Sequence, residues 1–314
     1  MLSYLVRRFF SLIVTLWLVS VLTFLVLQIV PGDPAQVVLG LQANPETLAR
    51  LREQMGLNQP PLVRYFNWIR SVVTGDFGSS FHYHVPVGEL ILTKLAVSGP
   101  LAALALLLTL LIALPLGIYA ASHHGRLGDY GIMLFSQLGL AVPTFWAGIL
   151  LIILFAVNLK WFPSGGFAGW AEDPLLSLRS LFLPALSLSL VQSAIITRMT
   201  RSAMLEVLNE DYVTTARSKG LAERVVIYKH ALKNAFISVA TVIGLQAGQL
   251  LAGAIIIEAV FHLPGMGGLV VLSIGQRDLP VIQGIVPVIA AVIVIVNFLV
   301  DLLYGYLDPR IRYD

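Results

Sequence analysis

The sequence predicts an all-α membrane protein with six transmembrane helices, and two observations carry that prediction. The first is composition: charged residues make up only 12% of the 314 residues and hydrophobic residues make up 57%, with a mean hydropathy of +0.85. A soluble chain carries about a quarter charged residues, so this chain cannot cover a water-facing surface. The composition excludes an ordinary cytosolic enzyme, a nucleic-acid-binding protein and a disordered protein.

The second observation is a set of apolar runs of about 20 residues, the length that an α-helix needs to cross a bilayer. A transmembrane barrel would instead show alternating segments of about ten residues. We expect the first run to be retained, because Val30-Pro31-Gly32-Asp33 offers no small-residue cleavage site. Pro115 and Pro143 lie inside the second and third runs, where a bundle tolerates kinks. The six runs are Phe9–Val30, Val97–Ala121, Gly131–Leu159, Leu181–Met199, Ala235–Ala259 and Ile282–Tyr306.

Basic residues predict the orientation of these spans, because lysine and arginine are enriched on the cytoplasmic side. They gather before the first run, between the second and third, and after the sixth (Arg7, Arg8, Arg126, Arg310, Arg312). More lie between the fourth and fifth runs (Arg198, Arg201, Arg217, Lys219, Arg224, Lys229, Lys233). The sequence therefore predicts a multi-pass protein with both termini in the cytoplasm.

The segment 31–94 is predicted to be a folded external insertion. Asn44 can cap a helix that has Pro45 at its first position and Gly56 just past its end. A second apolar stripe follows, and Gly75-Asp76-Phe77-Gly78 predicts a turn; the stripe is Leu62, Tyr65, Phe66 and Ile69. About 64 residues build little core alone, so we expect this segment to pack on the rim of the bundle. Its histidines lack a third ligand, so no metal site is expected.

The segment 205–235 is predicted to lie in the cytoplasm and to contain a short helix. Asp211 can cap a helix over Tyr212–Lys219, and Gly220 can end it in a left-handed conformation. One face would carry Tyr212, Thr215, Ala216 and Lys219, and its small residues would let a second body approach. A second stripe leads into the fifth span: Leu221, Val225, Tyr228, Leu232 and Phe236. Two interpretations remain open, an interfacial membrane anchor and a docking helix for a cytoplasmic partner.

This segment resembles the cytoplasmic loop of the permeases of ABC importers, in particular the branch for dipeptides, oligopeptides, glutathione and nickel. The resemblance rests on Asp211–Gly220 and His230–Ala235. Where the general loop pattern begins Glu-Ala-Ala, this chain has Thr214, Thr215 and Ala216. Further motifs of that branch occur along the chain: Pro31-Gly32-Asp33-Pro34, Gly56-Leu57-Asn58-Gln59-Pro60, Gly75-Asp76-Phe77-Gly78, Glu258-Ala259-Val260-Phe261, Pro264-Gly265-Met266-Gly267, Arg277-Asp278 and Asp308-Pro309-Arg310-Ile311-Arg312.

The resemblance implies the type I ABC importer permease fold and a division of the chain into four parts. These are an N-terminal transmembrane helix (1–30), the external periplasmic insertion (31–94), a permease core of five transmembrane helices (95–307) and a cytoplasmic tail (308–314). It implies a permease subunit in the bacterial inner membrane that imports short peptides by alternating access. Its implied partners are a second homologous permease, two cytoplasmic ATPases, an external substrate-binding protein and membrane lipid.

The resemblance also implies two functional surfaces, neither of them catalytic or metal-binding. The surface that couples to the ATPases would comprise Asp211, Tyr212, Thr214, Thr215, Ala216, Arg217, Lys219 and Gly220. An external scoop or gate would comprise Glu258, Phe261, Pro264, Gly265, Gly267, Arg277 and Asp278. Glycines and Pro264 predict a compact turn over 262–280, in which Arg277 and Asp278 would pair with each other or engage a polar solute.

No Gly-x4-Gly-Lys-Ser/Thr loop occurs in the sequence, so we expect no cofactor in this chain and expect ATP and Mg²⁺ to bind partner subunits. Glutathione, nickel complexes and opine-like compounds remain alternative solutes. An ion-coupled carrier is a further alternative, although it would need ionisable groups near the midplane, whereas Glu258 and Asp301 lie near span ends. An intramembrane serine hydrolase is disfavoured, because its Gly-x-Ser-x-Gly turn and intramembrane histidine are lacking.

Overall fold

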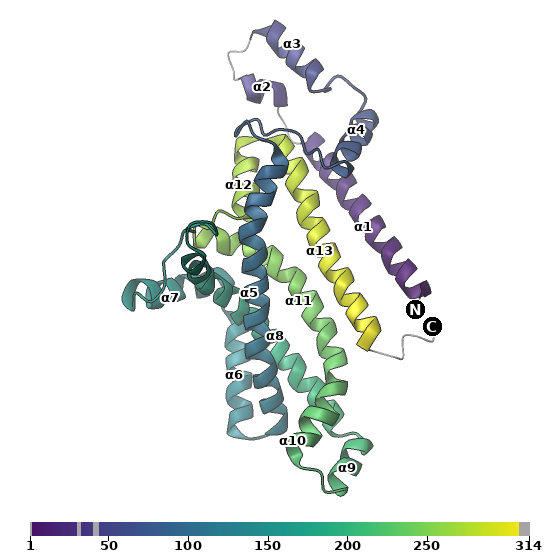
Figure 1. Ribbon diagram of the computed structural model, residues 1–314, viewed down its shortest axis with the longest axis vertical. Coiled ribbons are helices and arrows are strands. Elements are labelled where there is room, and N and C mark those ends of the chain that lie inside the picture. The colour runs from purple at the N-terminus through teal and green to yellow at the C-terminus, as the bar shows by residue number, and fades with distance from the viewer. Residues whose placement is uncertain (1, 30–32, 40–43, 308–314) are drawn as a thin grey trace. The chain divides into compact units, whose positions relative to one another are not determined.

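The computed structural model describes residues 2–29, 33–39 and 44–307, and over these residues the protein is all-α, with one isolated bridge between Ser79 and Pro86. Five helices in this part of the chain are long and apolar enough to cross a membrane (Figure 1). They are α1 (Leu2–Ile29), α5 (Val87–Ser122), α8 (Pro174–Leu208), the run formed by α10 (Glu223–Val225), η2 (Val226–Ala231) and α11 (Leu232–Val260), and α13 (Leu279–Leu307).

The predicted third span, Gly131–Leu159, is broken. It consists of α6 (Leu127–Ala141), α7 (Thr144–Leu151) and the π-helix η1 (Ile152–Asn158), and the two parts meet at an angle of 103°. Val142 is extended (φ −90°, ψ 121°), as expected for a residue that precedes proline. Because Pro143 cannot donate to the helix ladder, α6 ends there. The predicted six spans are therefore reached only if this bent pair is counted as one.

The shorter helices are α2 (Pro34–Leu39), α3 (Pro45–Gln54), α4 (Pro61–Val73), α9 (Asp211–Ser218) and α12 (Met266–Gln276). The predicted start of α3 is confirmed, since the Asn44 side chain accepts a hydrogen bond from the Glu46 backbone N–H at 3.1 Å. Gly56, just beyond its end, has φ +65°, a conformation that glycine adopts without steric strain.

The described chain divides into two compact units. The first comprises residues 2–8, 98–264 and 296–307, and the second comprises residues 9–97 and 265–295. In the first unit α8 is the central helix, and α6, α7 and α11 contact it. Gly117 of α5 lies so close to α8 that an added Cβ would stand 2.6 Å from Thr200 Cβ. Small residues therefore set the approach of these helices, as is common in membranes.

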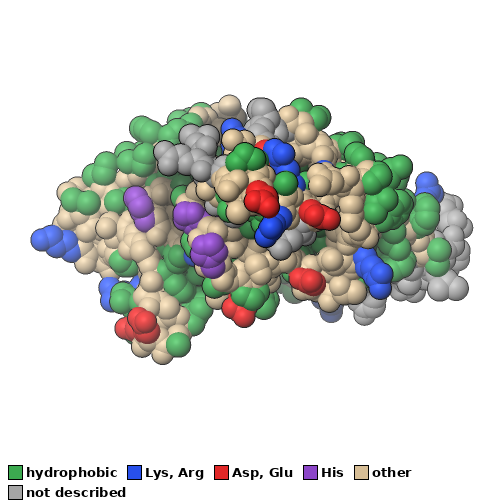
Figure 2. All heavy atoms as spheres, turned by 90° about the horizontal axis from the view of Figure 1, so that it is seen from above, with side chains coloured by type: hydrophobic (Ala, Val, Ile, Leu, Met, Phe, Trp, Pro, Cys, Tyr) green, Lys and Arg blue, Asp and Glu red, His purple; other side chains and the backbone are tan. Residues whose placement is uncertain are grey.

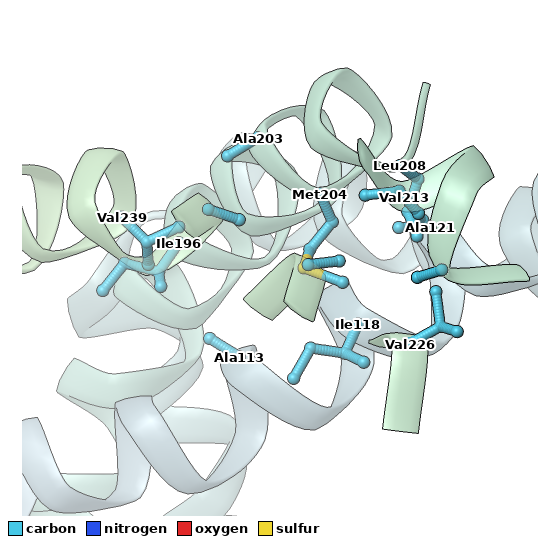
Figure 3. Close-up of a cluster of buried hydrophobic side chains, with 13 residues drawn as sticks. Ala113, Ile118, Ala121, Ile196, Ala203, Met204, Leu208, Val213, Val226 and Val239 are labelled. Atoms are coloured by element: carbon cyan, nitrogen blue, oxygen red, sulfur yellow. The ribbon is translucent and has the colours of Figure 1, made fainter. Parts of the chain in front are cut away.

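A buried cluster in the first unit gathers side chains from four helices and η2 (Figure 3). Ile196 and Met204 come from α8, Ile118 from α5 and Val239 from α11, and all four are buried. Val213 of α9 and Val226 of η2 belong to the same cluster. The short helix α9 is thus part of the packed core.

In the second unit the helix α4 packs on α1. Phe24 of α1 meets Tyr65 edge-on, with ring centroids 5.4 Å apart, and stacks on Trp68 at 6.0 Å. The hydroxyls of Ser20 and Tyr65 are 2.8 Å apart. Within the second unit the segment 31–94 therefore contacts α1 through α4, and its place on the rim of the bundle stays a prediction. A second cluster joins the start of α5 to α12 and α13 through Val87, Ile91, Met266, Leu269, Val281 and Ile285.

Candidate coupling and delivery surfaces

The helix α9 lies between α8 and α10 and starts one residue earlier than predicted. Glu210 is its N-cap, with extended backbone (φ −71°, ψ 147°), and no side-chain hydrogen bond caps it. Asp211 is therefore the first helical residue and not the cap. The predicted end is confirmed, because Gly220 has φ +76° and sits in the left-handed region that glycine favours.

Burial divides α9 into an inner and an outer face. Val213 and Ala216 are buried in the cluster of the first unit. The prediction that Ala216 belongs to an accessible face is therefore wrong. Val213 and Ala216 are three residues apart and share one side of the helix. The remaining predicted coupling residues are exposed: Asp211, Tyr212, Thr214, Thr215, Arg217, Lys219 and Gly220.

Two polar contacts tie α9 to the chain that follows it. Arg217 donates to both carboxylate oxygens of Glu223, with Nη2–Oε1 at 2.8 Å and Nε–Oε2 at 3.3 Å. These hydrogen bonds raise the pKa of the Arg217 guanidinium, because they favour its charged form. The Asn234 amide donates to the Tyr212 hydroxyl at 2.6 Å. The helix is therefore held to α10 and to α11 as well as to the core.

The π-helix η2 shifts the apolar stripe that was predicted to lead into the fifth span. The buried line runs through Val226, Ala231, Ala235 and Val239, and its first step is five residues because a π-helix closes its hydrogen bonds over five residues. The predicted stripe Leu221, Val225, Tyr228, Leu232 and Phe236 is not the buried one. Its first three members are exposed, with Tyr228 at 59%. They form, beside α9, an apolar strip that we call the Tyr228 strip.

Two residues of the predicted scoop, Glu258 and Phe261, are buried inside the first unit. Glu258 accepts a hydrogen bond from the Ser98 hydroxyl of α5, and its residue is 1% exposed. The Phe261 carbonyl accepts from the Gly166 N–H at 2.9 Å, and an added Cβ at Gly165 would stand 2.4 Å from that oxygen. Glu258 therefore joins α11 to α5, Phe261 joins the end of α11 to the loop that contains Gly166, and both residues are buried. The side chain of Asp301 lies outside the described residues, as does the motif Asp308–Arg312.

The predicted compact turn over 262–280 is instead largely a helix. Pro264 is exposed, Gly265 caps α12 with extended backbone, and Gly267 lies in its first turn. Glycine lowers helix stability by only about 1 kcal/mol relative to alanine. Met266 and Leu269 are buried against Val87 and Val281 in the second unit. This burial stabilises the helix by more than its glycines destabilise it.

Asp278 does not face a solute or pair with Arg277. It is 1% exposed and accepts hydrogen bonds from the Ser80 hydroxyl at 2.5 Å, the Phe81 N–H at 3.2 Å and the His82 N–H at 3.1 Å. Arg277 is exposed and has the left-handed backbone of a helix C-cap, with φ +55°. Asp278 is therefore a buried clamp on the 80–82 segment, a role that the sequence did not indicate because the partners lie nearly 200 residues apart.

A cavity of about 750 Å³ adjoins this clamp in the second unit. Arg64, Trp68, Ser80, Phe81 and Gln283 are among its lining residues. Partial burial lowers the pKa of Arg64.

Figure 2, which looks onto the end that carries α2 to α4, shows acidic and basic side chains interspersed among hydrophobic ones, with histidines among them.

A buried charge cluster that the sequence did not predict joins α6 to α8. Arg201 donates to Asp129 through Nε–Oδ1 at 2.6 Å and Nη2–Oδ2 at 2.8 Å. The Gly125 N–H donates to Asp129 Oδ2 at 3.0 Å, and His124 Nδ1 lies 3.0 Å from the same oxygen. No group of three or more side chains suited to holding a metal occurs among the residues that the structure describes.

Apolar helices long enough to cross a membrane, two of them joined by a short helix with one buried and one exposed face, define a polytopic membrane protein. Residues 113–313 match the family described as binding-protein-dependent transport system inner membrane component, and residues 1–102 match its N-terminal counterpart. The chain belongs to this family and is the permease component of an ABC importer. It is a transport subunit of the inner membrane.

Relatives of known description match the chain over its whole length. It is 43% identical to a peptide transport system permease protein of Brucella abortus, with 100% of each chain covered. It is 40% identical to the dipeptide transport system permease protein of Alkalihalophilus pseudofirmus and 38% identical to an oligopeptide transport system permease protein of Bacillus subtilis, again with 100% of each chain covered.

A solved structure supports the fold. The chain is similar to a chain of the inward-facing MetNI methionine ABC transporter, with a TM-score of 0.57 and 14% identity over 70% of this chain and 96% of that one. At this identity the likeness concerns the fold alone.

Proposed function

We propose that this chain forms half of the translocation pathway of an ATP-driven importer of short peptides. A second permease would form the other half, two cytoplasmic ATPases would drive alternating access, and an external binding protein would deliver the solute. ATP and Mg²⁺ would bind the ATPases. The peptide, dipeptide and oligopeptide permeases among the relatives support the solute class. The family description supports the binding protein.

The observation that carries the proposal is the construction of α9. Its inner face is locked in the core by Val213 and Ala216, while its outer face and the adjacent Tyr228 strip are exposed. A surface helix with no role beyond linking two spans would not need an exposed apolar strip beside it. An ATPase groove seated there would cover this strip.

The attachments of α9 support its role as a coupling element. The helix follows α8 directly, the Arg217–Glu223 pair joins it to α10, and the Tyr212–Asn234 hydrogen bond joins it to α11. A displacement of α9 by an ATPase would therefore move two spanning helices together. Small shifts are transmitted in this way because packed elements move as bodies and do not deform continuously.

The basic residues around α9 support a cytoplasmic position for it and for both termini. Because α11 crosses the membrane, the segment after Phe261 would then lie outside, where the binding protein docks. Of the predicted scoop residues, Arg277 and Pro264 are exposed there. We propose that α12 and Arg277, and not a flexible turn, meet the binding protein.

Uptake into proteoliposomes tests the proposal. The chain is reconstituted with the second permease and the ATPases, and labelled di-alanine and tri-alanine are added with the binding protein. We expect uptake that needs ATP hydrolysis and persists when an uncoupler collapses ion gradients. Loss of uptake on adding the uncoupler at constant ATP would contradict the proposal and favour an ion-coupled carrier. Uptake of glutathione, a nickel complex or an opine-like compound in place of the peptides would reassign the solute.

A further inference from the structure

One exposed face of α11 carries polar side chains at several levels of the helix. Its exposed residues recur every three or four positions and so lie along one line of the helix. The opposite side, which includes Val239, Gly244, Leu250 and Ile257, is buried. We call the exposed line the α11 stripe; it consists of Ser238, Thr241, Leu245, Gln249, Ala252 and Ile256.

The contrast with α5 is direct, because both helices belong to the membrane-spanning set. Along α5 the exposed residues in the same unit include Ala103, Leu107 and Leu111, a face that suits lipid. The α11 stripe instead presents two hydroxyls and one carboxamide. Hydrocarbon offers polar groups no hydrogen-bond partner, so polar side chains inside spans normally face a water-filled cavity or another polar group.

The local structure does not account for these polar groups. The Thr241 hydroxyl lies 3.4 Å from the Ile237 carbonyl of its own helix, a long hydrogen bond. A glutamine amide carries two N–H donors and an acceptor oxygen, and Gln249 is exposed. Such a face needs a polar environment outside this chain.

We infer that the α11 stripe lines the path taken by the solute and hydrogen-bonds the backbone of a passing peptide. The inference rests on the proposed function, which supplies the peptide. The stripe runs from residue 238 to residue 256, which is about 27 Å at a rise of 1.5 Å per residue, close to the roughly 30 Å of the hydrocarbon core. Uncharged side chains that donate and accept fit peptide N–H and C=O groups whatever the peptide's own side chains are. Weak contacts at several levels also let the solute leave.

Leu245 marks a constriction within this path. It is 64% exposed, more than Ile256, the other large apolar member of the stripe, and it stands one turn from Thr241 and one turn from Gln249. An apolar side chain between polar ones can close a pore by excluding water. The stripe is thus divided into a part near α9, with Ser238 and Thr241, and a part beyond Leu245, with Gln249.

Single cysteines test the stripe cleanly, because the chain has none of its own. The variants are Ser238→Cys, Thr241→Cys and Gln249→Cys, with Leu107→Cys and Leu111→Cys on α5 as matched controls. The reconstituted complex is treated with a charged, membrane-impermeant thiosulfonate, and labelling of this chain is followed by mass spectrometry. The measurement is made without nucleotide and after trapping with ATP and vanadate.

We expect the stripe cysteines to react at least tenfold faster than the α5 controls. Between the two states, the rates at residues 238 and 249 should change in opposite directions, because the constriction at Leu245 lies between them. Equal, slow labelling of stripe and controls would overturn the inference. So would protection of the stripe in both states together with disulfide cross-linking to the second permease, since the stripe would then be a helix–helix contact.

Two further variants keep the test independent of cysteine chemistry. Thr241→Val and Gln249→Leu should lower the maximal rate of tri-alanine uptake, measured with saturating loaded binding protein, at least fivefold, while Leu107→Val leaves it unchanged. An unchanged maximal rate in both stripe variants would contradict the inference. If the unaltered complex imports peptide but the stripe proves inert, the stripe alone fails and the proposed function stands.

Discussion

Arg201 of α8 and Asp129 of α6 form a bidentate ion pair, with Nε–Oδ1 at 2.6 Å and Nη2–Oδ2 at 2.8 Å. The Asp129 side chain is 2% exposed and the Arg201 side chain 19%. The pair joins two helices of the first unit, and Arg201 lies about two turns before the end of α8. It therefore fixes α6 to the helix that leads into the coupling surface.

Removing one partner of this pair should destabilise the protein strongly, because the other charge stays buried and unpaired. Asp129→Ala should lower the free energy of unfolding by about 3–5 kcal/mol, measured by thermal unfolding in detergent. His124→Ala, whose side chain is 60% exposed, is the matched control and should change it by less than 1 kcal/mol. A double variant that also carries Arg201→Gln should lose less than the two single losses added together; simple additivity would contradict a coupled pair.

Gly220 should tolerate only residues that accept a left-handed backbone. Its φ is +76° and the space for a side chain is open, so conformation and not crowding limits substitution. Gly220→Val forces a β-branched residue into that region, and we expect peptide uptake to fall while the protein still inserts and assembles. Gly220→Asn should retain most uptake, because asparagine adopts this conformation more readily. Normal uptake by the valine variant would mean that the end of α9 is not part of the coupling element.

The Asp278 clamp should matter for structure, whereas Arg277 should matter for delivery. Asp278→Asn replaces a carboxylate that accepts three hydrogen bonds with an amide that brings its own donors. The 78–84 segment should then exchange amide hydrogens faster, and the complex should lose roughly 1–3 kcal/mol of stability. Arg277→Ala should leave both unchanged but reduce the stimulation of ATP hydrolysis by the loaded binding protein. The reverse pattern in the two variants would refute this assignment.

The π-helix η2 should tolerate the loss of one residue. Deleting the exposed Lys229 brings Val226 and Ala231 to a spacing of four, which an α-helix buries on one face. We expect this variant to insert and assemble. Deleting Ser238 in the α-helical part should abolish assembly, because it rotates every buried residue before it by about 100°. Equal damage from both deletions would contradict the shifted register.

Local signals in the sequence were sufficient where the backbone itself set the structure. Asn44 and Pro45 located the start of α3, and Gly220 located the end of α9, because caps and left-handed positions depend on residue type. The same reasoning placed the N-cap of α9 at Asp211, one residue too late, because the cap is Glu210. An uncertainty of one residue is common at helix ends.

Contacts between distant segments could not be predicted in this way. No local pattern indicated that Asp278 would contact Ser80 or that Arg201 would contact Asp129, because such pairs depend on how distant segments pack. The prediction of an apolar stripe over Leu221–Phe236 assumed the α-helical period of 3.6 residues per turn. The π-helix η2 breaks that period. Ala216 was expected to be accessible, but packing against the core of the first unit buries it.

Cross-linking from α9 to an ATPase tests the central claim most directly. Cysteines are introduced at Thr215 on the outer face and at Tyr228 in the exposed strip, with Leu107→Cys on α5 as the control, and the assembled complex is treated with a short bifunctional thiol–amine reagent. The account predicts covalent products with the ATPase from the first two positions and none from the control. An intact complex that imports peptide with ATP, yet yields no ATPase product from Thr215 or Tyr228, would contradict α9 as the coupling surface.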